Sequence, residues 1–152
     1  FGKGPGVITF GSECVGGRNV ILRDSEVHGA TRLLQMKMRP DTPQRYEYVL
    51  VENITGEVRW AFYVHPWTQF FDLKGREDIP MSYGEHVTIR NCRLTCSEQA
   101  IEIAEKPDQY QLSDIVIEDN NVFTELHQAP RRAQKKQDWE LPKGTPEAEK
   151  NK

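Results

Sequence analysis

Four stretches of the chain repeat one pattern of polar and apolar positions. Each opens on a residue with a polar group, continues with mostly β-branched or leucine side chains, and closes on a charged residue followed by Asn or Asp. The four stretches are Asn19–Asp24, Tyr48–Asn53, His86–Asn91 and Asp114–Asp119. Matched positions lie 29, 38 and 28 residues apart. A pattern that recurs at intervals of this size is typical of repeat architectures.

Three of the four stretches are followed by a second short strand pattern. These second strands are expected at residues 33–38, 60–65 and 100–104. The distance from Val20 to Leu34 is 14 residues, and the distance from Val87 to Ile101 is the same. The spacing between the first and the second strand of a repeat is therefore kept, as well as the pattern of the first strand.

The repeats predict an all-β chain folded as a parallel β-solenoid of about four coils. Val and Ile suit strands, and stacked coils bury apolar side chains that one coil cannot bury alone. Asn and Asp tolerate left-handed backbone at turns, so the closing residues should form a ladder along the stack. Its members would be Asp24, Asn53, Asn91 and Asp119. A β-sandwich is the alternative, because it also has short strands separated by regular turns.

Two insertions interrupt the repeat, at residues 39–47 and 66–85. Insertions in a solenoid emerge as loops on one face, which is often the binding face. The second insertion is rich in aromatic side chains, namely Trp67, Phe70, Phe71 and Tyr83. These rings either pack over the side of the solenoid as a lid or stack against the faces of sugar rings.

The end of the chain differs in composition from the rest. Residues 129–152 contain seven Lys or Arg and four Asp or Glu, a net charge of +3, against −6 for residues 1–128. Their sizeable apolar side chains are Trp139 and Leu141, too few to offset the entropy of ordering. We therefore expect a solenoid domain at 1–128 and a polar, disordered tail at 129–152. The abrupt start inside a motif, Phe1-Gly2-Lys3-Gly4, leads us to expect the C-terminal part of a longer solenoid.

Charge and cysteine content exclude several classes of protein. The net charge of −3 is unlike that of nucleic-acid-binding proteins, which usually show a basic face. Three Cys without a Cys-x-x-Cys or His-x-x-x-His pair predict no zinc site, and we expect no cofactor. No apolar run is long enough for a transmembrane helix, and the first residues lack the pattern of a signal peptide. We expect buried, inert thiols, although Cys92 and Cys96 are close enough in sequence to pair across a turn.

Residues Gly4–Glu13, with Gly16-Gly17-Arg18-Asn19-Val20 after them, resemble glycoside hydrolase family 28, the polygalacturonases and related pectin-degrading enzymes. The family pattern there is Gly-His-Gly, a short apolar strand, Gly-Ser, a Gly-Gly pair and Asn-Val. A later short strand of the family carries Arg-x-Lys, and the matching residues here are Gln35-Met36-Lys37. The resemblance covers residues 2 to about 125.

The resemblance implies a right-handed parallel β-helix that hydrolyses α-linked galacturonate or a related uronic-acid polysaccharide with inversion. Inverting hydrolysis needs a carboxylic acid and a carboxylate on opposite sides of the scissile bond. The family takes both from Asp motifs upstream of Gly-His-Gly, and these motifs are not in this chain. The family His falls at Pro5, or at Lys3 if Gly2-Lys3-Gly4 is the matching triplet, so no catalytic residue is assigned here.

The family Arg and Lys hold the substrate carboxylate, and only Lys37 keeps its residue type. With Gln35 at the Arg position, Arg32, Lys3 or Arg39 would have to compensate. Otherwise the enzyme acts on a different sugar or has lost its activity.

Strand alternation extends the candidate substrate contacts to the next coil. Gln35 and Lys37 share one face of their strand, opposite the face of Leu34, Met36 and Met38. Tyr63 and His65 share the equivalent face one coil along, so both pairs could line one surface groove. His65 is the best candidate for help in proton transfer, because its ordinary pKa lies near neutrality. The alternative for each is an exposed side chain without a role, and a solvated carboxylate is expected at Glu102.

We conclude from the sequence that the chain is part of a polygalacturonase-like glycoside hydrolase, and that the fragment alone is inactive. The expected partner is a polysaccharide, with no nucleic acid or membrane bound, and the full-length protein is expected to be a monomer. A polymeric substrate cannot enter a cell, so a secreted or periplasmic location is expected. The alternative is a non-catalytic β-helix that binds carbohydrate or serves a structural role.

Overall fold

The computed structural model describes residues 6–69 and 71–124, and these form strands, turns and loops without a helix. Lys3, Pro5 and the segment 129–152 lie outside the described residues. The strands are β1 (Gly6–Phe10), β2 (Gly16–Met38), β3 (Arg45–Pro66), β4 (Ser82–Arg90), β5 (Arg93–Cys96), β6 (Ile101–Ile103), β7 (Tyr110–Glu118) and β8 (Asn121–Thr124). None of the described elements is a helix long and apolar enough to cross a membrane.

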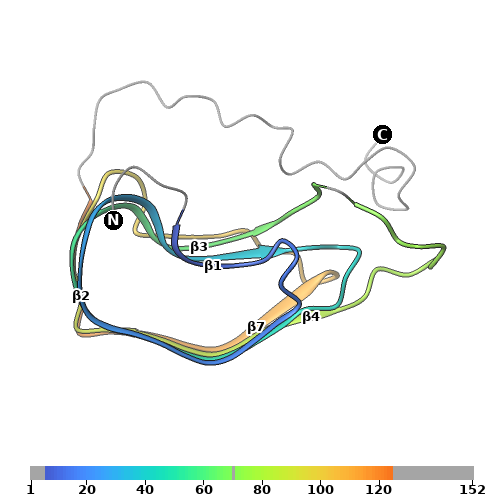
Figure 1. Cartoon of the computed structure of the whole chain (residues 1–152), viewed down its shortest axis with the longest axis horizontal. Helices are drawn as coiled ribbons and strands as arrows, with labels where there is room; N and C mark the ends of the chain where they lie inside the picture. Colours follow the sequence, from blue (N-terminus) through green and yellow to red (C-terminus); the bar gives the residue numbers. More distant parts are fainter. Residues whose placement is uncertain (1–5, 70, 125–152) are drawn as a thin grey trace.

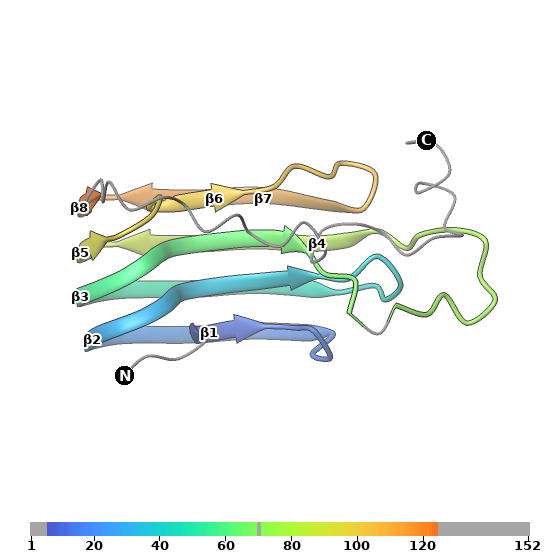
Figure 2. The ribbon, with the colours of Figure 1, turned by 90° about the horizontal axis from the view of Figure 1, so that it is seen from above.

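All eight strands belong to one sheet, and every pairing between them is parallel. The long strands β2 and β3 bend, so that each contributes to three faces (Figure 1). Segments far apart in the sequence lie side by side in the stack (Figure 2). This arrangement is consistent with a parallel β-helix. The parallel pairing argues against the β-sandwich, whose sheets are antiparallel.

Three faces follow from the register of the strands. The first face consists of 16–23, 45–52, β4 and β7. The second face consists of 25–28, 54–58, β5 and β8. The third face consists of β1, 32–38, 60–66 and β6.

The four sequence repeats align residue by residue on the first face. Val20 pairs with Val49, Val49 with Val87, and Val87 with Ile115. Val49 and Val87 are buried in the core, and Val20 and Ile115 pack against it. The predicted register is therefore confirmed.

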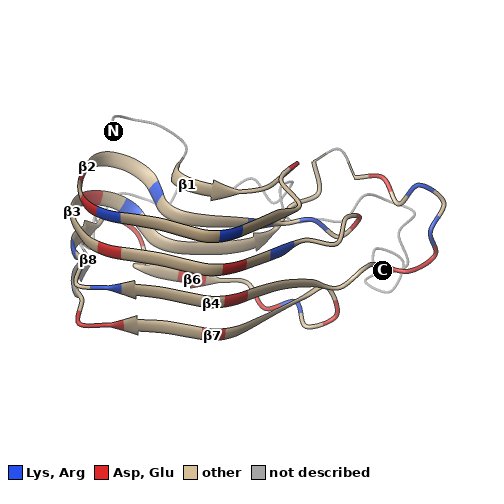
Figure 3. Cartoon of the chain, turned by 60° about the horizontal axis from the view of Figure 1, so that its bottom comes forward, with Lys and Arg blue, Asp and Glu red and all other residues tan. Residues whose placement is uncertain are grey.

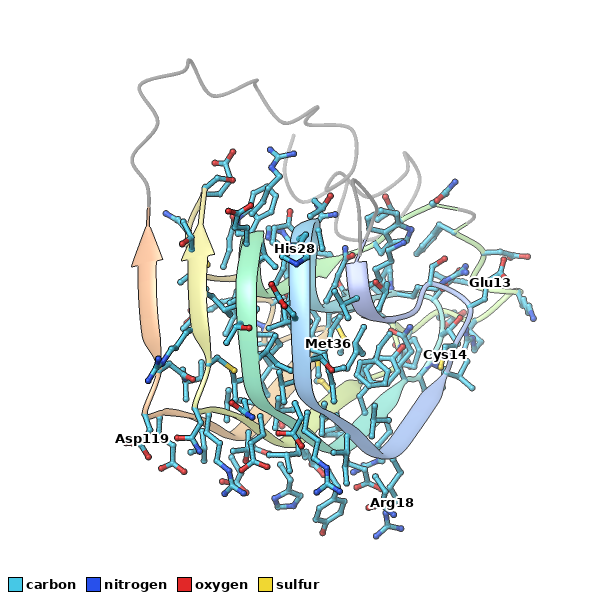
Figure 4. All side chains as sticks on the ribbon, turned by 60° about the vertical axis from the view of Figure 1, so that its left-hand side comes forward. Glu13, Cys14, Arg18, His28, Met36 and Asp119 are labelled. Carbon is cyan, nitrogen blue, oxygen red and sulfur yellow. The ribbon has the colours of Figure 1, made fainter. Side chains whose placement is uncertain are left out.

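The core lies between the three faces. It takes side chains from every face, such as Val51 from the first, Ile54 from the second and Met36 from the third, all fully buried. Met36 points into this interior (Figure 4). Burial largely alternates along strands such as β4, because successive side chains point to opposite sides of a sheet, whereas residues 33–36 and 60–66 of the third face are buried at successive positions.

The predicted Asn and Asp ladder is also confirmed. Asp24, Asn53, Asn91 and Asp119 all have a positive φ, of 51–52°. Asn53 donates a hydrogen bond from Nδ2 to Oδ1 of Asp24, at 2.7 Å. This short side chain thus links the turns of two stacked repeats.

A second row of left-handed residues lies within the first face, where the sequence suggested an uninterrupted strand. Its members are Asn19, Tyr48, His86 and Asp114, with φ of 52–57°. Tyr48 and His86 stack with ring centroids 4.6 Å apart, and His86 Nδ1 lies 2.5 Å from Asp114 Oδ2. Contacts along this row therefore accompany a backbone conformation that Tyr and His rarely adopt.

At one register position of the first face, the sign of the charged residue alternates from one repeat to the next (Figure 3). Arg23, Glu52, Arg90 and Glu118 occupy one register position. Arg90 Nε donates to Glu52 Oε1 at 2.8 Å. Opposite charges on neighbouring strands favour this register, although exposed pairs contribute only about 0–1 kcal/mol each.

The loops that join the third face to the first face leave the stack at one corner (Figure 2). They comprise 11–15, 39–44, 67–81 and 104–109, with residue 70 not described. The insertions predicted at 39–47 and 66–85 extend too far at their C-terminal ends, and the second also begins one residue too early, because Pro66 is the last residue of β3. Residues 45–47 and 82–85 are strand, because they pair with the preceding repeat in register.

Candidate functional site

The candidate site is on the outer side of the third face, where polar and aromatic side chains from neighbouring repeats meet. The register places Gln35 beside Tyr63, Lys37 beside His65, and Tyr63 beside Glu102. The predicted grouping of Gln35, Lys37, Tyr63 and His65 on adjacent strands is therefore present. Lys3 lies outside the described residues.

Lys37 is held between the core and a loop aromatic ring. Its neighbours Met36 and Met38 are fully buried, so strand alternation turns Lys37 outward. Its Nζ lies 4.2 Å from the centroid of the Trp67 ring. Burial, together with the positive charge of Arg32, lowers the pKa of Lys37 from its usual value. Trp67 thus packs over a cation, and this part of the second insertion acts as a cover.

Gly11 lies directly against Lys37. Its φ is +90°, and a Cβ atom added there would lie 2.6 Å from the carbonyl oxygen of Lys37 and 3.0 Å from its Cβ. A side chain at position 11 would collide with backbone that cannot move aside. Gly11, in the loop after β1, and Lys37, in β2, both belong to the family resemblance and are thereby brought together.

Gln35 and Tyr63 are more enclosed than the sequence suggested. Gln35 is 1% exposed and Tyr63 is 0% exposed, which differs from the expectation that they line an open groove. Tyr63 packs edge-on against Trp60 at 5.2 Å and stacks on His65 at 4.0 Å. These aromatic neighbours cover a side chain that strand alternation alone would leave in solvent.

His65 is also covered, and this changes its chemistry. It is 8% exposed, and burial together with the charge of Arg32 lowers its pKa to about 4. The imidazole is therefore neutral at pH 7. A neutral ring can accept a proton but is a poor proton donor, so the sequence-based role in acid catalysis finds no support in its pKa.

Glu102 is engaged by the cluster, although a solvated carboxylate was expected. Trp60 Nε1 donates a hydrogen bond to Glu102 Oε2 at 2.8 Å. The other oxygen, Oε1, lies 3.2 Å from His65 Nε2. Glu102 therefore fixes the indole of Trp60 and approaches His65 from the adjacent strand.

Arg32 is indicated by the sequence only as a possible substitute for the family Arg, and Trp60 is not singled out by the sequence at all. Its guanidinium lies 4.3 Å from the centroid of the Tyr63 ring and 5.2 Å from that of Trp60. Alternation from Leu34 would turn Arg32 toward the core, but its guanidinium lies over the ring of Tyr63, on the outer side of the third face. Aligning the repeats pairs Arg32 with Trp60, and this pairing is the signal by which the sequence could have indicated that the two side chains meet. We call Arg32, Trp60, Tyr63, His65 and Glu102 the Arg32 cluster.

A buried carboxylate ties together the loops beside the site. Asp41 is 2% exposed and accepts two hydrogen bonds from Arg39, at 2.8 and 2.7 Å. The backbone N–H of Asp72 donates to Asp41 at 2.6 Å, and Arg76 donates to its carbonyl oxygen. The hydrogen bonds to Arg39 and to the Asp72 N–H hold the pKa of Asp41 below its usual value despite burial. Asp41 thus fixes the loop 67–81 against the loop 39–44.

The cysteines and acidic groups offer no further chemistry at the site. Cys92 and Cys96 are buried and unpaired, and burial raises the pKa of both thiols. Cys14 is exposed, which differs from the expectation of a buried thiol. Within residues 6–69 and 71–124, no three His, Cys, Asp or Glu side chains are grouped so as to hold a metal ion.

The comparisons with known proteins return no match. No protein-family model, no curated protein and no solved structure matches this chain. The function must therefore be argued from the residues and from their arrangement.

Proposed function

We propose that the chain is part of a right-handed parallel β-helix of about four coils, from a polygalacturonase-like glycoside hydrolase. The substrate would be pectic or a related uronic-acid polysaccharide, cleaved with inversion. The observation that carries the proposal is the contact between Gly11 and Lys37. Both residues belong to the pattern that resembles the family, and the fold brings them within van der Waals distance.

The proposed role of this chain is to bind the polysaccharide rather than to cleave it. The two carboxyl groups that inverting hydrolysis requires are not assigned to any described residue. Lys37 would contact a substrate carboxylate, with Trp67 beside it to contact the apolar face of a sugar ring. No cofactor is needed for this chemistry. The protein would be secreted or periplasmic, because the polymer stays outside the cell, and it would act as a monomer.

Hydrolysis is tested with the full-length protein by measuring the reducing sugar released from polygalacturonate and from other pectic polymers. Release is expected from wild type, and Lys37→Ala should raise KM at least tenfold. Arg23→Ala is the matched control, because Arg23 is an exposed cation on the first face of the same strand. Absence of release from every pectic polymer would refute the hydrolase proposal.

The second candidate function is non-catalytic binding or support by the β-helix. It is favoured by the residues at the family positions, where Pro5 or Lys3 replaces His and the buried Gln35 replaces Arg. In this case acidic oligosaccharides would bind to the full-length protein in calorimetry without being cleaved. Product formation in the same samples would exclude it.

A further inference from the structure

We propose that the segment 129–152 binds to the end of the stack formed by β6 and β7, where Trp139 and Leu141 cover exposed apolar side chains. The segment itself lies outside the described residues. Its two sizeable apolar side chains are too few for it to fold alone, but the end of the stack offers them an apolar surface. This inference is independent of the proposed enzymatic function and of the candidate site.

The end of the stack at β6 and β7 exposes side chains that belong to the inward side of their strands (Figure 2). Within the described residues, β6 pairs only with β3 and β7 only with β4. Ile117 is 38% exposed, whereas its register partner Ile89 is a core residue at 2%. Ile101 is 42% exposed, whereas its register partner Phe62 is fully buried in the core. The two isoleucines are therefore exposed because no described strand lies over them, and the ends of solenoids normally need such a cover.

A hollow of about 460 Å³ lies at the same end. All of its lining residues belong to β6, to β7 or to the loop between them, so it opens at the end of the stack. Its apolar lining includes Ile103, Leu112 and Ile115, which pack against the core from this end. Pockets that bind small organic molecules have volumes of about 300–1,000 Å³, so the hollow has room for an indole or a leucine side chain.

Opposite net charges favour contact between the segment and this end of the stack. Residues 97–124, which include β6, β7 and β8, contain seven Asp or Glu and one Lys, a net charge of −6. The segment 129–152 carries a net charge of +3. Four of its basic residues lie close together, namely Arg131, Arg132, Lys135 and Lys136. Complementary charges of this kind select the partner and the orientation in which it binds.

The row of alternating charges on the first face ends on an acid at the same end. Arg90 Nε donates to Glu52, whereas Glu118, the last member of the row, has no ion pair within the part of the chain that the structure describes. The position beyond Glu118 would therefore favour a cation, and the segment 129–152 has seven Lys or Arg.

The segment follows directly from the end of the stack that it would cover. β8 ends at Thr124, and Trp139 lies 15 residues further on, a length that spans up to about 50 Å when extended. The nine residues of β7 cover about 30 Å, so Trp139 can reach any part of this end. A segment tethered by a short flexible linker has an effective concentration on the order of millimolar. A second copy of the chain lacks this advantage, and the protein's own segment is therefore the favoured occupant.

Limited trypsin digestion of the full-length protein tests the contact, because cleavage follows the population of the unbound segment. Trypsin cuts after Lys and Arg, so the bonds within 131–136 report on the segment, and mass spectrometry gives their rate of cleavage. These bonds should be cut at least tenfold more slowly in wild type than in the double variant Trp139→Ala/Leu141→Ala. Thr145→Ala is the control, a change at a polar residue of the same segment, and should be cut at the rate of wild type.

Ile101→Asn tests the other side of the contact. It places a polar group on the exposed end of the stack and should also speed cleavage within 131–136 at least tenfold. Ile21→Asn is the matched control, because Ile21 is an exposed isoleucine of β2 on the first face, and it should leave the rate unchanged. Thermal unfolding of each variant shows whether it is folded.

Each outcome bears on the inference. Protection that is lost both in Trp139→Ala/Leu141→Ala and in folded Ile101→Asn supports it. Equal cleavage of wild type and Trp139→Ala/Leu141→Ala overturns it, because the segment is then free, as expected for a disordered tail. Protection that survives in folded Ile101→Asn overturns the stated contact, since the segment then binds elsewhere. Protection that rises with protein concentration, with a dimer in sedimentation, overturns it as well, because a second copy is then the occupant.

Discussion

The imidazole of His65 stacks on the phenol ring of Tyr63, with centroids 4.0 Å apart and an interplanar angle of 25°. The two residues are neighbours on one side of β3, and both are withdrawn from solvent. The stack joins the Arg32 cluster to the row of Lys37, because His65 pairs with Lys37 across the strands. A change in the charge of His65 would therefore alter the electrostatic environment of both Arg32 and Lys37.

Acid should destabilise the protein through His65. The folded pKa of about 4 lies below the ordinary value of 6.5, so the unfolded chain binds a proton first as the pH falls. Protonation of His65 leaves the free energy of unfolding unchanged above pH 6.5. As the pH falls from 6.5 to 4, it lowers the free energy of unfolding by about 2–3 kcal/mol. Urea unfolding at pH 7 and pH 4.5 measures it.

The variant His65→Phe keeps a ring on Tyr63 but cannot titrate. Its free energy of unfolding should fall less between pH 7 and pH 4.5 than that of wild type. The control is His28→Phe, because His28 is exposed and pairs with Glu26 at 2.9 Å. An equal pH dependence in wild type and His65→Phe would contradict the prediction.

Gly11→Ala should destabilise the protein more than Gly29→Ala. Both glycines have a positive φ, of +90° and +70°, and both replacements strain the backbone by about 1 kcal/mol or more. A Cβ at Gly29 meets nothing within 4 Å, whereas one at Gly11 collides with the backbone of Lys37. We expect an additional loss of about 1–3 kcal/mol for Gly11→Ala, measured by urea unfolding. Equal losses would show that the contact with Lys37 is not restrictive.

Asn53→Val should be destabilising by about 2 kcal/mol, because a β-branched residue is strained at φ 52° and the hydrogen bond to Asp24 is lost. Asn53→Gly loses the same hydrogen bond without the steric strain, so it should cost less. Chemical denaturation distinguishes the two. If Gly were as damaging as Val, the hydrogen bond and not the backbone conformation would account for the ladder residue.

Asp41→Asn should release the loop 67–81. The substitution leaves the Arg39 guanidinium, whose side chain is 11% exposed, without its carboxylate, and we expect a loss of about 3 kcal/mol. Limited proteolysis should then cleave within this loop at least tenfold faster. Asp78→Asn is the control, because Asp78 is an exposed residue of the same loop. Unchanged cleavage in Asp41→Asn would show that Asp41 does not anchor it.

Register and turn chemistry could be predicted from the sequence because each depends on a local pattern that repeats. The alignment of Val20, Val49, Val87 and Ile115 needs only the spacing of β-branched residues, and the ladder at Asn53 needs only the turn preference of Asn. Tyr48 and His86 were harder to predict. Residues of these types seldom adopt left-handed backbone, so no local signal indicated their positive φ.

The burial of the candidate site could not be read from strand alternation. Alternation separates two sides of a strand, but it does not say whether the outer side is covered. Tyr63 and His65 are covered by each other, by Trp60 and by Arg32, and these contacts depend on how side chains from different repeats pack. The sequence indicates Arg32 only as one possible substitute for the family Arg, because alternation from Leu34 would turn its side chain toward the core.

The loops leave the stack at one corner, so the unequal distances of 29, 38 and 28 residues between repeats do not disturb the pairing of the strands. Length added there extends away from the sheet instead of shifting it. The protein thus separates two demands on its sequence. The strands preserve the architecture, while the loops at this corner can differ in length from one repeat to the next.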